Sequence, residues 1–215
     1  MTPTLGGLFT AAAAGLLVSP LLVCWTAALA AGERVGWWRP RPVPMSRWAV
    51  TATATVLLTS LAAAGNPGAA WWILAVGGAV LSVVDAQTQL LPARFTYPFA
   101  AAVGGALVLG SILGGEPAGL LRAAAAAAVI GAITLTIRFL SPPTMGLGDI
   151  RVAVLVAGLL GATGWSTLWQ GQLLILLMGG LTAMVLRIRT PGSGLKFAVP
   201  MGPAIFLGSL LALWL

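Results

Sequence analysis

The stretch Ala70-Trp-Trp-Ile-Leu-Ala-Val-Gly-Gly-Ala-Val-Leu-Ser-Val-Val84 is followed directly by Asp85. An uncharged apolar run of this kind is typical of a membrane-spanning helix, and an aspartate beside such a run is costly unless it has a function. Asp149, the only other aspartate in the chain, directly precedes a second apolar run at residues 150–162. The chain therefore carries two isolated carboxylates at the edges of apolar segments.

Apolar segments dominate the 215-residue chain, in which 59% of residues are hydrophobic and 7% are charged. A soluble domain of this size could not bury so much apolar surface. We therefore predict an all-α polytopic integral membrane protein, formed by one transmembrane domain over residues 1–215 with about eight spanning helices. The predicted spans are residues 5–31, 48–64, 70–84, 95–113, 119–140, 150–162, 167–186 and 198–215.

Positive charge is distributed unequally between the breaks that separate these spans. Ten of the eleven Lys and Arg residues lie in or beside the breaks after the first, third, fifth and seventh spans, and Arg122 is the exception. Because cytosolic loops are enriched in Lys and Arg, we expect these breaks to face the cytosol and both termini to lie on the non-cytosolic side. The longest break, residues 32–47, is predicted to be a basic strap. The net charge of +7 is thus explained by topology and lipid contact, and we expect no nucleic-acid partner.

The acid and base groups available for catalysis are few, because the chain has no histidine and a single cysteine, Cys24. A zinc site needs about four N, S or O ligands, and Ser-His-Asp or Cys-His catalysis needs a histidine base. We therefore expect no metal and no cofactor. Four carboxylates remain, of which Glu33 and Glu116 lie in polar breaks where a solvated charge needs no further explanation.

Two interpretations of Asp85 and Asp149 remain open at this point. Each can cap a helix, since an aspartate after a Gly-rich turn is a good N-cap residue. Alternatively, both lie at the cytosolic ends of short spans, at similar depth, and act as a pair that shares one proton and activates water on a peptide carbonyl. If each lies at the end of its helix, Asp85 at a C-terminus and Asp149 at an N-terminus, the helix dipoles favour ionisation of Asp149 and leave the proton on Asp85.

Three motifs resemble those of the type IV prepilin peptidases, which are bacterial intramembrane aspartyl proteases. Gly146-Leu147-Gly148-Asp149, flanked by Met145 and by Ile150-Arg151, is similar to the family's GxGD motif. Asp85-Ala-Gln-Thr-Gln-Leu-Leu-Pro92, followed by Arg94 and Pro98, is similar to the family's first-aspartate segment. Val199-Pro200-Met201-Gly202-Pro203 resembles its Pro-x-Gly-Pro element. The motifs occur in the family's order, and the resemblance extends over residues 70–215.

The resemblance implies that Asp85 and Asp149 are the catalytic pair of an aspartic endopeptidase. The implied reaction removes the short basic leader from a prepilin or pilin-like precursor at the cytosolic face of the bacterial plasma membrane. Gly146 and Gly148 would let the backbone approach the substrate or the partner carboxylate, where a side chain would block it. Supporting roles are expected for the other motif residues, namely Arg151, Pro92, Pro200, Gly202 and Pro203.

The first 50 residues match the family poorly. Larger members carry a cytosolic insertion, often with Cys pairs, that is associated with methylation of the new N-terminus. Because the equivalent strap at residues 32–47 has no cysteine, we expect peptidase activity without methyltransferase activity. Two further hypotheses remain, a proton-coupled transporter or channel that uses the same carboxylates and a catalytically inactive assembly component. The sequence does not predict an oligomeric state.

Overall fold

The computed structural model describes residues 5–31, 44–64, 68–89, 91–141, 146–189 and 199–215, with side chains from residue 10 onward except at residue 64. These residues form eight α-helices and one 3-10 turn, and no strand occurs among them. The elements are α1 (Leu5–Ala30), α2 (Met45–Ala64), α3 (Ala69–Thr88), α4 (Ala93–Leu113), α5 (Pro117–Leu140), α6 (Leu147–Thr163), α7 (Trp165–Arg189), α8 (Gly202–Leu211) and η1 (Ala212–Trp214). Most of the predicted strap lies outside the described residues, as do Glu33 and Met145.

The helices have the length and composition of a membrane protein. Five of them are long and apolar enough to cross a membrane, namely α1, α3, α4, α5 and α7. Two others are shorter, since α6 has 17 residues and α8 has 10. A helix satisfies its backbone hydrogen bonds within itself, which is required where lipid replaces water. The predicted all-α polytopic fold with eight helical segments is confirmed.

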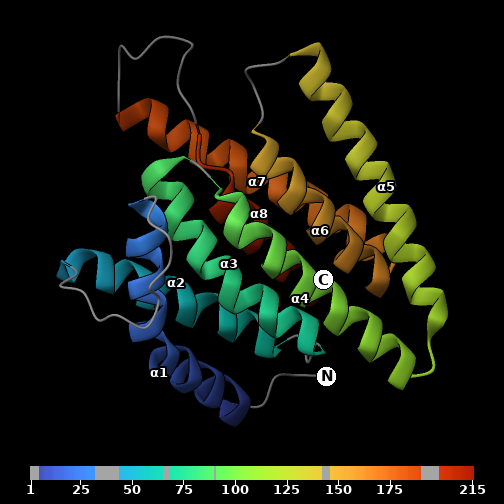
Figure 1. Cartoon of the computed structure of the whole chain (residues 1–215), viewed down its shortest axis with the longest axis horizontal. Helices are drawn as coiled ribbons and strands as arrows, with labels where there is room; N and C mark the ends of the chain where they lie inside the picture. Colours follow the sequence, from blue (N-terminus) through green and yellow to red (C-terminus); the bar gives the residue numbers. More distant parts are fainter. Residues whose placement is uncertain (1–4, 32–43, 65–67, 90, 142–145, 190–198) are drawn as a thin grey trace.

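The two helices that carry the aspartates, α3 and α6, are held through shared neighbours (Figure 1). Helix α3 packs against α1, α2, α4 and α8, and α6 packs against α4, α5, α7 and α8. Both therefore contact α4 and α8. The first helix, in the part of the chain that matches the family poorly, packs on α3 through Leu22, which contacts Val80 and Val84.

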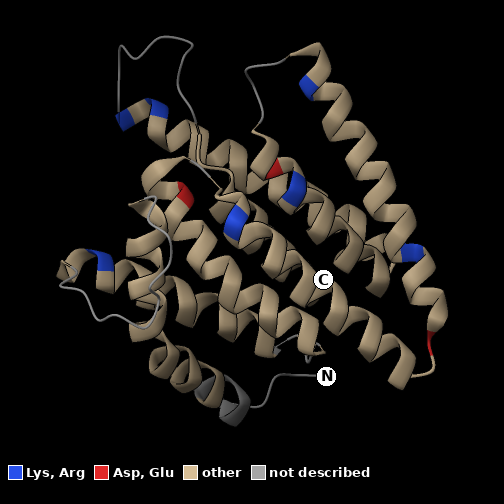
Figure 2. Ribbon diagram, in the orientation of Figure 1, with Lys and Arg blue, Asp and Glu red and all other residues tan. Residues whose placement is uncertain are grey.

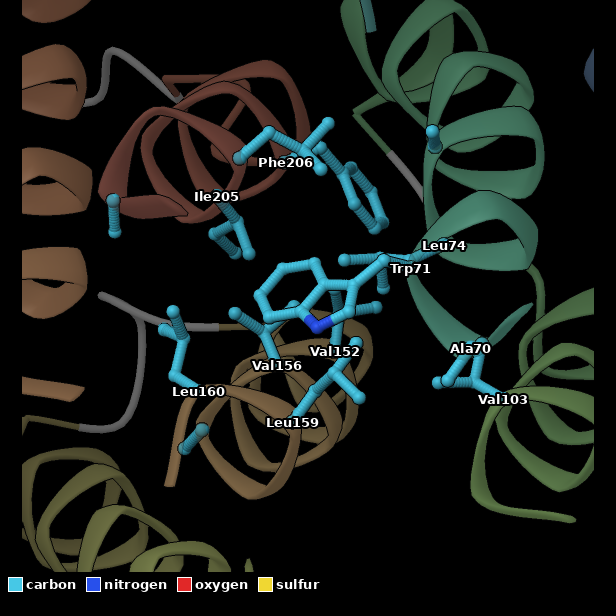
Figure 3. Close-up of a cluster of buried hydrophobic side chains, with 14 of the residues drawn as sticks. Ala70, Trp71, Leu74, Val103, Val152, Val156, Leu159, Leu160, Ile205 and Phe206 are labelled. Carbon is cyan, nitrogen blue, oxygen red and sulfur yellow. The ribbon is translucent and has the colours of Figure 1, made fainter. Parts of the chain in front are cut away.

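A buried apolar cluster fills the space between α3, α6 and α8. Figure 3 shows the indole ring of Trp71 on α3 lying between side chains of α8 and side chains of α6. The members of this cluster on the other two helices include Val152, Val156, Leu159, Leu160, Ile205 and Phe206. Burial of large side chains stabilises the arrangement by roughly 1.5–3 kcal/mol for each side chain. The cluster thus fixes three helices whose ends form the candidate site.

Helix α3 extends beyond its predicted span, with a consequence for the first aspartate. Helix α3 continues to Thr88, so Asp85 lies in its last turn and not at its end. The helix ends at Gln89, which has a left-handed backbone conformation with φ of 53° and donates its N–H to the carbonyl oxygen of Asp85 at 2.8 Å. The sequence placed the end of this span at Val84 because the residues after it are polar, although Ala, Gln and Thr are compatible with a helix.

Candidate functional site

Two carboxylates from different helices lie at the same end of the bundle. Asp85 on α3 and Asp149 on α6 lie close enough for their charges to interact. The side chain of Asp85 is 3% exposed, and that of Asp149 is half-buried. In Figure 2 the acidic segments of α3 and α6 lie in the upper half of the view, as do the basic segments near the starts of α4 and α6 and the ends of α5 and α7. Residues far apart in sequence are thus brought together.

Asp85 is held by the start of α8. The backbone N–H of Gly202 donates a hydrogen bond to Oδ2 of Asp85 at 2.7 Å. Gly202 is the first residue of α8, where backbone N–H groups have no partner within the helix. A Cβ atom at this position would lie 3.0 Å from both Cβ and Oδ2 of Asp85, so glycine allows the approach. The Pro-x-Gly-Pro element therefore contacts the first aspartate directly.

Asp149 is the third residue of α6, and Gly146 is its N-cap residue. The backbone N–H of Gly146 donates a hydrogen bond to Oδ2 of Asp149 at 3.3 Å. This is the position from which an acidic side chain reaches back to the start of its own helix. The capping interpretation is thus correct in part for Asp149, although the aspartate is not itself the N-cap residue.

Gly148 lies close to the backbone of the segment that follows α3. A Cβ atom on Gly148 would lie 2.7 Å from Cβ of Leu91 and 3.2 Å from the carbonyl oxygen of Leu91. The close approach is therefore to the segment between α3 and α4, and the expected approach of this glycine to the substrate or to the partner carboxylate stays a prediction. Pro92, the next residue, is the N-cap of α4, and its carbonyl oxygen accepts the N–H groups of Phe95 and Thr96, each at 3.0 Å.

The remaining supporting residues surround this end of the bundle. The guanidinium group of Arg151 lies over the ring of Tyr97, with Cζ 4.8 Å from the ring centroid, and so connects α6 to α4. Pro203 follows Gly202 in the first turn of α8, and Pro200 precedes the helix. The contacts of Leu91 and Tyr97 were not predicted from the sequence, because neither residue type signals a site and their partners lie on another helix.

The expected difference between the two aspartates is not supported by the observed helix ends. That expectation required α3 to end at Asp85, but α3 continues for three residues beyond it. In addition, the N-terminal end of α8 meets the Asp85 carboxylate, and an N-terminal helix end favours an anion. Each aspartate therefore accepts an N–H at the start of a helix, and helix polarity gives no reason to assign the proton to Asp85.

Paired carboxylates can perform general acid–base chemistry on water. Two that lie close together do not both ionise readily, so one can donate a proton while the other accepts one. Within the described residues, no three His, Cys, Asp or Glu side chains lie together. Among the described side chains at this end of the bundle, the two aspartates can therefore serve as the acid and the base.

Comparison with known proteins gives one match. Residues 72–188 match the model of the type IV leader peptidase family, a range that includes both aspartates and slightly more than half of the chain. No curated protein and no solved structure gives a significant match. The matched residues run from α3 to α7, whereas Gly202 lies beyond them.

Proposed function

Because the chain belongs to the type IV leader peptidase family, we propose that Asp85 and Asp149 are its catalytic pair. Membership makes the protein a membrane peptidase that acts on a protein precursor. The observation that carries the proposal is that the two aspartates lie at the same end of the bundle, close enough for their charges to interact, and that each accepts a backbone N–H. These hydrogen bonds involve Oδ2 of each residue.

The proposed mechanism is hydrolysis by a shared-proton pair. The ionised carboxylate takes a proton from a water molecule as the water oxygen attacks the scissile carbonyl carbon. The protonated carboxylic acid gives its proton to the carbonyl oxygen. When the tetrahedral intermediate collapses, the C–N bond breaks and the leaving amine receives the proton that came from water. The other aspartate, now ionised, takes a proton back from a hydroxyl group of the intermediate, which re-forms the carbonyl and restores the pair. Each aspartate thus alternates between acid and base, as in other carboxylate pairs.

The proposed substrate is a prepilin or pilin-like precursor with a short basic leader and an apolar helix. Cleavage is proposed to occur at the cytosolic face of the bacterial plasma membrane. The distribution of charge supports this orientation, because Arg94 lies in the first turn of α4 and Arg151 follows Asp149 by two residues on α6. Arg47 lies in the first turn of α2 and Arg187 in the last turn of α7, which is the arrangement expected for cytosolic helix ends.

Methyltransferase activity is not part of the proposed function. Helix α1 ends at Ala30 and α2 begins at Met45, so residues 31–44 are the whole connection between them. A connection of this length has little room for a folded insertion that binds a cofactor.

The test is cleavage of a pilin-like precursor encoded in the same genome by the detergent-purified protein. We expect Asp85→Asn and Asp149→Asn each to lower kcat by about 10²–10⁴-fold, the usual contribution of general acid–base catalysis. Glu116→Gln is the matched control, since this exposed carboxylate precedes α5 at the other end of the bundle. Wild-type rates in both Asn variants would refute the proposal, and proton-dependent flux in liposomes without cleavage would favour a transporter.

A further inference from the structure

A buried hydroxyl group lies one helical turn before Asp85. Ser82 on α3 is 7% exposed, and its Oγ atom is buried without a hydrogen-bond partner in the structure. A buried polar group without a partner costs roughly 1–3 kcal/mol, so such groups are rare and call for an explanation. The position of Ser82, three residues before a candidate catalytic carboxylate, suggests where the explanation lies.

Other buried hydroxyl groups in these helices behave differently. Each donates to a backbone carbonyl three or four residues earlier, which is the usual arrangement for Ser and Thr within a helix. Examples at 2.7–2.9 Å are Ser19, Thr26, Thr55, Thr134 and Ser209. The Ser82 hydroxyl has the same local option but is not bonded in this way. Its orientation is therefore set by its surroundings and not by its own helix.

Ser82 lies on the side of α3 that faces α8. Gly78 and Asp85, four residues before and three after it, both contact that helix. A Cβ atom on Gly78 would lie 2.6 Å from the ring of Phe206, and Asp85 accepts the N–H of Gly202. Residues three apart on a helix have Cβ atoms about 5–6 Å apart, and helical side chains lean toward the N-terminus. The Asp85 carboxyl group therefore leans toward Ser82.

We propose that Ser82 is a positioning residue for Asp85, whose hydroxyl group holds the Asp85 carboxyl group through one bridging water. The structure shows no direct bond between the two side chains, and a water molecule can bridge two polar groups that are too far apart for a direct hydrogen bond. Gly202 holds Oδ2 from the α8 side, and the bridge from Ser82 holds Oδ1 from within α3. The plane of the carboxyl group is then fixed from two directions. This inference rests on the proposed function of Asp85.

The first test compares cleavage by Ser82→Ala, Ser82→Thr and Ser209→Ala with cleavage by the wild-type protein. We expect Ser82→Ala to lower kcat by about tenfold with KM unchanged, since one hydrogen bond that matters in the transition state has an effect of that order. Ser82→Thr keeps the hydroxyl group and should retain most of kcat. Ser209 is the matched control, because it is a fully buried serine whose hydroxyl group donates to the carbonyl oxygen of Phe206.

The second test does not require cleavage. In an Asp149→Asn background, infrared spectroscopy detects the carbonyl stretch of protonated Asp85, assigned by its loss in Asp85→Asn. The chain contains four acidic side chains, which keeps this spectral region simple. We expect Ser82→Ala to move the band to higher frequency because the carboxyl group loses a hydrogen bond, whereas Ser209→Ala should leave it in place.

The outcomes separate this inference from the proposed function. An unmoved carbonyl band in Ser82→Ala would overturn the bridge to Asp85, whether or not the protein cleaves a precursor. Wild-type kcat in Ser82→Ala, or equal losses in the Ala and Thr variants, would also overturn it. A moved band in a protein that cleaves no precursor would support the bridge and refute the peptidase.

Discussion

Replacement of Gly148 by alanine tests whether the contact between α6 and Leu91 positions the second aspartate. The added Cβ atom would lie 2.7 Å from Cβ of Leu91 and 3.2 Å from its carbonyl oxygen. Ordinary contact between carbon atoms is about 3.5–4.0 Å, so the two segments must separate by roughly 1 Å. Neither Leu91 atom is at the end of a flexible side chain. The separation must therefore come from movement of the backbone.

This movement would displace the catalytic pair. Asp149 is the next residue in the chain, and its position relative to Asp85 depends on how the start of α6 lies against the segment after α3. A misplacement of about 1 Å lowers catalysis by about 10²-fold, and an overpacked contact destabilises a protein by about 1–3 kcal/mol. We therefore expect Gly148→Ala to lower kcat by about 100-fold while the protein still folds.

The assay is cleavage of the precursor, together with thermal unfolding in detergent. Gly105→Ala is the matched control, because Gly105 lies exposed within α4 and an added Cβ atom would meet nothing within 4 Å. Alanine is the better helix former by about 1 kcal/mol, so this control should retain activity and be no less stable. Wild-type kcat in Gly148→Ala would refute the argument that this contact positions Asp149.

Two further predictions concern α8 and the orientation of the protein. Gly202→Ala would place Cβ 3.0 Å from Oδ2 of Asp85 and weaken the hydrogen bond from the Gly202 N–H to that oxygen. Precursor cleavage should therefore slow by about tenfold. An unchanged rate would contradict the role of Gly202 in holding Asp85. The orientation can be tested by thiol labelling of intact cells with a membrane-impermeant reagent, in a Cys24→Ser background. Ser166→Cys at the start of α7 should react, and Ser46→Cys at the start of α2 should not. Reversed labelling would contradict the inferred orientation.

The helices could be predicted from the sequence because lipid imposes a simple rule. Each spanning segment must be apolar over about 20 residues, and the breaks contain Gly, Pro or charge. One boundary that differed was the end of α3, where a polar Ala-Gln-Thr segment continues the helix past Asp85. Polarity alone could not predict this extension, since the helix ends only where Gln89 adopts a left-handed conformation.

The sequence could also predict the two aspartates and their flanking motifs, but not the contacts between motifs. Gly148 and Gly202 were expected to be important as motif residues, yet their neighbours, Leu91 and Asp85, were not foreseen. A glycine in a motif indicates that a side chain would obstruct something without indicating what. The role of Ser82 was equally hidden, because a serine in a helix normally bonds to its own backbone.

The contact between Asp85 and Gly202 extends the site beyond the residues that carry the family match. The matched range ends at residue 188, whereas the N–H that holds Asp85 comes from the first turn of α8. Helix α8 also packs against α3 and α6, and Phe206 fills the space beside Gly78. A shift of α8 would therefore remove a hydrogen bond from Asp85 and loosen the packing that holds α3 against α6. For this reason the catalytic unit that we propose includes α8, and its geometry depends on packing as much as on the two aspartates.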